Sequence, residues 1–161
     1  MNPCPCGYFG DRRRSCRCSP QQIRQYQAKI SGPLLDRIDL HIEVPSVKYR
    51  ALADSRTGES SAAVKKRVSE ARAVQKKRFG NAAVTTNARM TEQQIRAFCA
   101  IDEASHQLME MAIEKLGLSA RAMNRILKVS RTIADLDGRE KIDSAHVAEA
   151  ISYRSLDRSL V

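Results

Sequence analysis

Four cysteines near the N-terminus have the residue type and spacing of a metal site. Cys4, Cys6, Cys16 and Cys18 form two C-x-C pairs separated by nine residues, in a segment rich in proline, glycine and arginine. Four thiolates suit a tetrahedral zinc ion, and metal binding would order a loop that is too short to build a core. Free or adventitiously oxidised thiols are the alternative, because C-x-C pairs indicate metal binding less strongly than C-x-x-C pairs.

Arginines accompany these cysteines, at positions 12, 13, 14 and 17. A metal-held loop would display Arg12, Arg13, Arg14 and Arg17, where they can contact the phosphate backbone of DNA. Contact with a neighbouring subunit is the competing interpretation. Elsewhere, Cys99 follows a phenylalanine in a helical stretch and is expected to be a buried apolar residue. The three histidines share no ligand spacing, so we assign them no catalytic role.

The amino-acid composition indicates the kind of partner and the cellular compartment to expect. The 161 residues suffice for one domain, or for one domain and a large part of another. The 28 Lys and Arg residues against 18 Asp and Glu leave a net charge of +10, which favours an anionic partner such as nucleic acid or nucleotide. Neither a membrane-spanning apolar run nor a secretory signal is present, so we expect a cytoplasmic protein with reduced thiols. Reduced cysteines in a dense group favour metal binding over disulfides.

Hydrophobic periodicity predicts a mainly α protein. Helices are expected at about residues 21–31, 60–79, 92–98, 102–116, 119–137 and 144–153. Gly117 and Gly138 should end the fourth and fifth of these. On the 60–79 helix, Val64, Val68, Ala71 and Val74 lie along one side. The basic residues, Arg78 included, are expected to form a solvated face, with contact to an anion as the alternative.

One clear strand is expected within residues 34–45. Ile38, Leu40, Ile42 and Val44 alternate there with polar residues, which predicts a strand with one buried face. A single strand cannot make a sheet, so its neighbours should lie in another chain or in sequence outside these residues.

Four ordered blocks of sequence then carry a family resemblance. "MNPCPCG", "KISGPLLDRIDLHIEVP", "LSARAMNRILKVSRTIADLDG" and "HVAEAISYRSLD" closely resemble the C-terminal part of the magnesium-chelatase-related AAA+ ATPases of the ComM competence type. The resemblance implies a hexameric ring ATPase that acts in DNA branch migration during natural transformation, with helicase-like activity. It also implies a remnant of an AAA+ α/β core at residues 1–47, with the cysteine-rich loop at 3–20, a linker at 48–59 and a helical lid at 60–161.

The nucleotide-binding motifs of that family are not found in these residues. No G-x-x-x-x-G-K-[ST] occurs, and the family's Walker A and Walker B motifs precede the segment that resembles "MNPCPCG". ATP and Mg²⁺ would therefore be bound by the full-length protein, and we expect the 161-residue chain alone not to hydrolyse ATP.

The resemblance implies roles for three residues. Asn2 matches sensor 1, whose amide orients the attacking water, and Arg37 matches the arginine finger, which stabilises the transferred phosphoryl group of a neighbouring subunit. Arg121 matches sensor 2, the lid arginine that contacts nucleotide.

The residues alone suggest plainer roles for these arginines. Arg37 lies between Asp36 and Asp39, where an exposed ion pair is the ordinary expectation. In the 119–137 helix, an apolar stripe is expected from residues spaced four and three apart, namely Ala122, Ile126, Val129, Ile133 and Leu136. Arg121, Arg125 and Lys128 are spaced to form a basic face opposite that stripe, and Arg125 and Lys128 are expected to remain solvated.

Two other functions stay open. One is a free-standing, zinc-stapled, basic nucleic-acid-binding module that uses the cysteine loop and the basic helix. The other is a magnesium chelatase subunit of porphyrin synthesis, although the resemblance suggests that the chelatase branch lacks the cysteine array.

Overall fold

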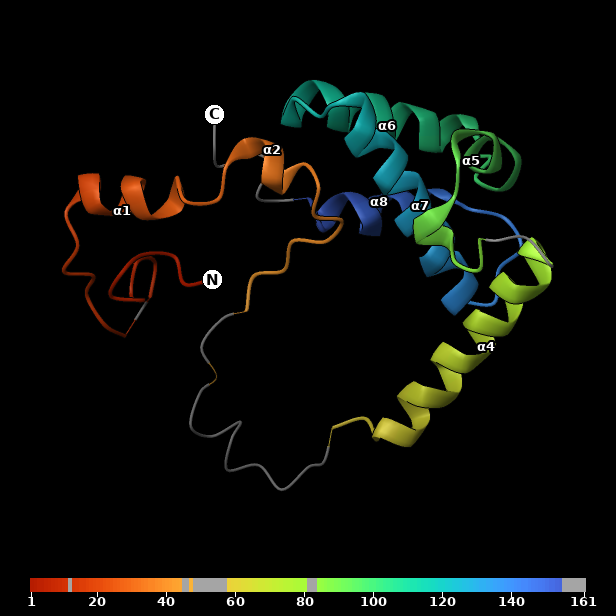
Figure 1. Cartoon of the computed structure of the whole chain (residues 1–161), viewed down its shortest axis with the longest axis horizontal. Coiled ribbons are helices and arrows are strands. Elements are labelled where there is room, and N and C mark those ends of the chain that lie inside the picture. Colours follow the sequence, from red (N-terminus) through yellow and green to blue (C-terminus); the bar gives the residue numbers. More distant parts are fainter. Residues whose placement is uncertain (12, 45–46, 48–57, 81–83, 155–161) are drawn as a thin grey trace. The chain divides into compact units, whose positions relative to one another are not determined.

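A computed structural model of the chain describes residues 1–11, 13–44, 47, 58–80 and 84–154 (Figure 1). The chain divides into two compact units, Met1–Ile38 with Glu43–Asp54, and Asp39–Ile42 with Ser55–Val161. The described residues are mainly helical, as the sequence predicts. None of the described helices has the length and apolar character that a membrane crossing requires.

The first unit contains the cysteine loop, then α1 (Pro20–Gln27), and further along the short helix α2 (Gly32–Leu35). Ser19 begins this helix with a capping box: its hydroxyl accepts from the Gln22 N–H at 3.3 Å, and the Gln22 side chain accepts from the Ser19 N–H at 2.9 Å. The Gln27 amide donates to the Pro3 carbonyl at 3.2 Å, which ties the end of the helix to the start of the loop.

The strand expected at residues 34–45 is absent from the part of the chain that the structure describes. A short helix, α2 (Gly32–Leu35), covers its beginning. The apolar side chains expected on its buried face are 38–83% exposed, namely Ile38, Leu40, Ile42 and Val44. The prediction is wrong for a physical reason, since a strand needs a neighbouring strand and the described residues contain none. The one backbone hydrogen bond found between this segment and a distant described residue joins the His41 N–H to the Tyr153 carbonyl, at 2.7 Å.

The second unit is a bundle of five α-helices and one 3₁₀ turn among the residues described (Figure 1). They are α4 (Ser61–Phe79), η1 (Asn87–Arg89), α5 (Glu92–Phe98), α6 (Glu103–Leu116), α7 (Ala120–Leu136) and α8 (Ser144–Ser152). These match the expected helices closely, because each α-helix begins after a Ser, Thr or Asp whose side chain accepts a first-turn N–H. Gly117 ends α6 in the left-handed conformation with φ of 62°.

Helix α7 lies at the centre of this bundle and packs against α4, η1, α5 and α8. Its Ala122, Ile126 and Ala134 side chains are at most 1% exposed, and Val147 of α8 is fully buried. Leu136, expected in the same stripe, is instead 39% exposed at the end of the helix. Burial of each larger aliphatic side chain adds about 1.5–3 kcal/mol to the free energy of unfolding, so this core supplies most of the bundle's stability.

A buried polar network joins the C-terminal ends of α4 and α7. Asp135 accepts from Arg78 at 2.5 and 2.7 Å, from the Asn87 amide at 2.8 Å and from the Arg131 Nε at 3.1 Å. Burial would raise the pKa of Asp135, but the hydrogen bonds from Arg78 and Asn87 and the charges of both arginines lower it below its ordinary value. The carboxylate therefore stays ionised and holds two guanidinium groups in place.

The expectation of a solvated Arg78 is wrong. Its side chain is only 13% exposed, because Arg78 lies on the same side of α4 as the buried Ala71 and Gln75. Of the apolar side expected on that helix, only Ala71 is buried, because Val64, Val68 and Val74 are 37%, 45% and 43% exposed. The buried side of α4 instead contains Ala71, Gln75 and Phe79.

Substitution Asp135→Ala tests whether this network supports the bundle. Removing one partner of a buried ion pair leaves the Arg78 and Arg131 charges uncompensated, so we expect the free energy of unfolding to fall by about 3–5 kcal/mol. Urea unfolding followed by circular dichroism measures this change.

Glu92→Ala is the matched control, because its ion pair with Arg96 joins side chains that are 74% and 82% exposed. We expect no measurable change for this variant. Equal unfolding curves for the two variants would contradict a structural role of the network.

Candidate functional site

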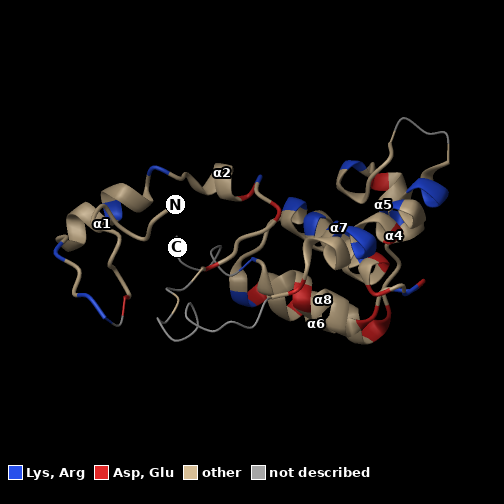
Figure 2. Ribbon diagram, turned by 90° about the horizontal axis from the view of Figure 1, so that it is seen from below, with Lys and Arg blue, Asp and Glu red and all other residues tan. Residues whose placement is uncertain are grey.

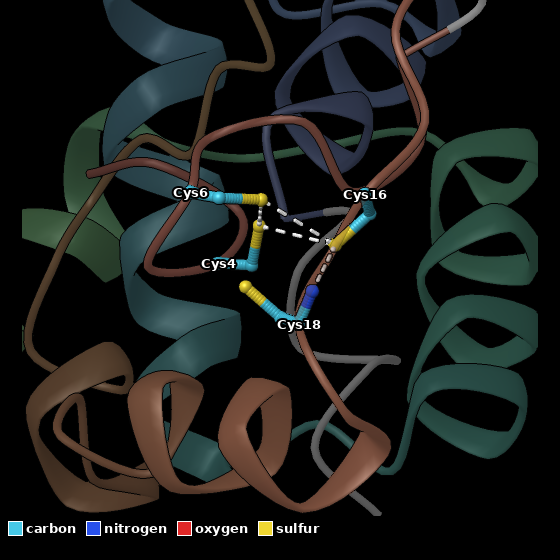
Figure 3. Close-up of side chains that lie close together, drawn as sticks. All are labelled: Cys4, Cys6, Cys16 and Cys18. Atoms are coloured by element: carbon cyan, nitrogen blue, oxygen red, sulfur yellow. Dashed lines mark hydrogen bonds between the residues drawn. The ribbon is translucent and has the colours of Figure 1, made fainter.

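The four loop cysteines converge on one point, as their spacing predicts (Figure 3). The Sγ atom of Cys4 lies 3.4 Å from that of Cys6 and 3.7 Å from that of Cys16, and the Cys6 and Cys16 sulfurs are 3.6 Å apart. With Cys18 included, all four sulfurs lie within 4.8 Å of one another, and Cys4 is fully buried.

These distances fit a tetrahedral metal centre. Metal–sulfur bonds of about 2.3 Å in a tetrahedron place the sulfurs about 3.8 Å apart, close to the spacings found here. Thiolates are soft ligands that select zinc and similar ions over magnesium or calcium. The cysteine cluster is therefore able to hold a metal ion.

A tight turn brings the first pair of thiols together. The Gly7 N–H donates to the Cys4 carbonyl at 3.0 Å, and Gly7 has a φ of 83°, which a side chain would disfavour. Pro5 fixes the backbone between the two cysteines. The sequence C-P-C-G thus folds both side chains toward the same point.

Backbone N–H groups point at the sulfurs and stabilise thiolate charge. The N–H groups of Tyr8 and Arg17 bond to the Cys6 thiol and lower its pKa to about 6. The Cys18 N–H bonds to the Cys16 sulfur at 3.4 Å. Such donors orient metal ligands and support their negative charge.

The neighbouring thiols oppose the ionisation of Cys16. The Cys18 N–H lowers the pKa of Cys16, but desolvation and the neighbouring Cys6 and Cys4 thiols raise it more, so it lies at about 12. A divalent ion removes this conflict, because it stabilises all four thiolates together. Cys99 is different: it is 4% exposed, and burial raises its pKa to about 11, so it is the apolar core residue that the sequence predicts.

The arginine-rich part of the loop is held by local contacts. Asp11 accepts the backbone N–H groups of Arg13 and Arg14 at 2.6 and 3.3 Å. The Arg14 guanidinium lies 5.2 Å from the centre of the Tyr8 ring and donates to its hydroxyl at 2.7 Å. Arg12 lies outside the described residues.

Asn2 and Arg37 belong to the first unit and are both exposed. The Asn2 side chain lies beside the cysteine turn, where a Cβ atom on Gly7 would be 3.7 Å from its amide nitrogen. Arg37 follows α2, and its N–H donates to the Leu34 carbonyl at 3.0 Å. The nucleotide roles of these residues remain predictions.

Arg121 belongs to the second unit and is exposed in the first turn of α7, after the N-cap Ser119. Arg125 forms an ion pair with Asp39, and the Lys128 ammonium donates to the Ala88 carbonyl at 3.1 Å. Both side chains are partly exposed, and each also contacts a protein group. The four cysteines are the set of predicted site residues that the structure brings together.

Comparison with known proteins identifies the family. Residues 58–154 match the model of the C-terminal region of magnesium chelatase subunit ChlI, and residues 1–52 match the model of magnesium chelatase subunit ChlI. The chain belongs to the magnesium-chelatase-related family. Its curated relatives place it with the ComM-type members. The competence protein ComM of Haemophilus influenzae is 44% identical over 99% of the chain, and the protein YifB of Escherichia coli is 42% identical over 100% of the chain.

These relatives are much longer than the chain. The chain spans 30% of the ComM protein and 31% of YifB. A Mycobacterium bovis protein, Mb2921c, is 33% identical over 95% of the chain, which again spans 30% of the relative. The matched region of this magnesium-chelatase-related family thus includes both units described above.

Sequence reasoning missed the polar network of the helical unit. Arg131 and Asp135 have an i, i+4 spacing that signals a possible ion pair, but this pattern is more often exposed. Asn87 follows a polar linker and has no local signal, although it is 1% exposed. Only the tertiary packing of α4 against α7 shows that these groups meet.

Substitution Gly7→Ala tests whether the turn organises the metal site. An L-residue in the left-handed region costs about 1–2 kcal/mol, so we expect metal binding to weaken about 5- to 30-fold. Titration with Co²⁺, followed by the visible absorbance of its thiolate complex, measures this affinity.

The matched control is Gly138→Ala, because Gly138 also has a positive φ, of 66°, but belongs to the helical unit. We expect its Co²⁺ titration to equal that of the unsubstituted chain. Equal weakening by both substitutions would contradict a local role of the Gly7 turn.

Proposed function

We propose that the chain is the C-terminal part of an ATP-driven AAA+ ring motor that acts on DNA, in the manner of a branch-migration helicase. The observation that carries this proposal is the match to ComM over 99% of the chain, spanning both units. In this proposal, ATP and Mg²⁺ bind mainly to parts of the longer protein, and these residues complete the site at the border between ring subunits.

Arg37 acts as the arginine finger in this proposal. Transfer of a phosphoryl group spreads negative charge over its equatorial oxygens, and a guanidinium group offers a rigid fork of donors that matches them. The exposed position of Arg37, directly after α2, supports this role, because a finger must reach the nucleotide of a neighbouring subunit. Asn2 orients the attacking water through its uncharged amide.

Arg121 contacts the nucleotide phosphates as sensor 2. Its exposed position in the first turn of α7 supports this role, because N–H groups and the helix dipole favour an anion there. The buried Asp135 network and the apolar core hold the rest of α7, so this guanidinium stands on a rigid support.

The cysteine cluster binds one structural zinc ion. The sulfur spacing, four thiolate donors and N–H groups directed at the sulfurs support zinc, which prefers such closed tetrahedral sites. The zinc ion orders the loop that links Asn2 to α1 and takes no part in phosphoryl transfer.

Substitution Arg37→Ala in the full-length protein tests the proposed role of Arg37 in ATP hydrolysis. Loss of an arginine finger removes charge stabilisation from the transition state, so we expect kcat for ATP hydrolysis to fall about 10³-fold or more. Nucleotide binding should stay within about twofold, because the finger acts in the transition state. A coupled-enzyme ATPase assay and titration with a fluorescent ATP analogue measure the two quantities.

Arg24→Ala is the control, because Arg24 is an exposed arginine of the same unit, on α1. Its turnover should match that of the unsubstituted protein. Unchanged turnover of Arg37→Ala would remove the finger assignment, and weakened nucleotide binding alone would reassign Arg37 to ground-state binding.

A further inference from the structure

The cysteine loop exposes a set of side chains that neither the metal site nor the ATPase site uses. Phe9 is 48% exposed, and Arg13, Arg14 and Arg17 are exposed on the same loop. A single exposed apolar side chain is ordinary on a protein surface. A loop that exposes a phenyl ring together with three guanidinium groups is less ordinary, because this combination suits unpaired bases and phosphates.

The charge around the loop is strongly positive. Residues 1–38 contain seven Lys and Arg residues against two acidic ones, and basic segments precede and follow the start of α1 (Figure 2). Asp11, the one acidic residue of the loop, directs an oxygen at two backbone N–H groups. A divalent ion on four thiolates has a net charge of minus two, which still leaves this segment positive. The positive charge of this segment therefore favours an anionic partner.

The loop also offers flat surfaces for stacking. Arg14 lies over the Tyr8 ring, with its charged carbon 5.2 Å from the ring centre, and it is fixed there by the 2.7 Å hydrogen bond to the hydroxyl. Such a planar pair has little freedom to lose when a base stacks on it. Just after α1, the Lys29 ammonium lies 5.4 Å from the centre of the Tyr26 ring and adds a second cation beside an aromatic group.

We propose that this surface of the cysteine loop binds single-stranded nucleic acid. Arg13 and Arg17 contact phosphates, and Phe9 stacks against a base. Phe9 favours a single strand over a duplex. The bases of a duplex are stacked on one another, so their faces are not open to a phenyl ring, whereas those of a single strand are. The inference rests on the proposed function, since it identifies where the motor would contact DNA.

Binding of a fluorescein-labelled oligodeoxythymidylate to the full 161-residue chain, followed by anisotropy, tests the proposal. The probe has about twenty nucleotides, which exceeds the length that one such site covers. The double variant Arg13→Gln/Arg17→Gln should bind at least about fivefold more weakly. Its salt slope should fall by about 1.4, since each phosphate contact on a single strand contributes about 0.7.

The matched control is Arg72→Gln/Lys76→Gln, which removes the same charge from exposed positions on α4. Its affinity should stay within about twofold of the unsubstituted chain. Equal losses in the two double variants would overturn the proposal, because net charge alone would then explain binding.

Phe9→Ala tests the stacking step. Loss of one stacked base weakens binding about 5- to 150-fold. Met111→Ala, a control at a 45% exposed apolar position of α6, should leave the affinity unchanged. A Phe9→Ala variant that binds like the unsubstituted chain, tighter binding of a duplex of equal length, or equal binding of polyglutamate would each overturn the single-strand assignment. Circular dichroism confirms that each variant is folded.

The outcomes separate this inference from the proposed function. If the loop variants bind DNA normally while Arg37→Ala abolishes hydrolysis in the full-length protein, the motor stands and the loop proposal fails. If the loop variants lose binding while Arg37→Ala hydrolyses ATP normally, the loop proposal stands and the finger assignment fails. Absence of oligonucleotide binding by the unsubstituted chain would overturn the loop proposal.

Discussion

The first unit depends on one electrostatic constraint: four thiols lie within 4.8 Å of one another and cannot all ionise without a cation among them. Among the described residues of its Met1–Ile38 segment, only Cys4 and Leu35 are buried. Apolar burial therefore cannot order this segment, and a metal–thiolate centre is the interaction able to do so. The Gly7 turn and the N–H groups directed at the sulfurs are arranged around the four thiols.

The helical unit is stabilised in a different way. Its aliphatic core surrounds α7, and the Arg78–Asp135–Arg131 network fixes the end of that helix against α4. A buried network of this kind adds little net stability over apolar packing, but it specifies one arrangement of the helices. Because the first turn of α7 carries the exposed Arg121, a fixed helix places one guanidinium group reliably.

The sequence predicted the structural features that neighbouring residues in the chain determine. It failed for features that depend on contacts between residues far apart in the sequence. Capping residues and apolar periodicity located the helices within a few residues, and cysteine spacing located the thiol cluster. The strand containing Leu40 was wrong because strand pairing is non-local. The solvated Arg78 was wrong because composition does not show which side of a basic helix meets a buried carboxylate. The roles of Asn2, Arg37 and Arg121 came from family resemblance, and they stay predictions.

Zinc content of the purified chain tests the central claim most directly. The account predicts one zinc ion per chain after purification under reducing conditions, its loss in Cys4→Ser, and its retention in Cys99→Ser, since Cys99 lies in the helical core. Elemental analysis, with protein quantified through sulfur, measures this ratio, and a thiol reagent counts the accessible cysteines. A chain without metal whose four loop thiols all react freely, or are paired as disulfides, would contradict the account.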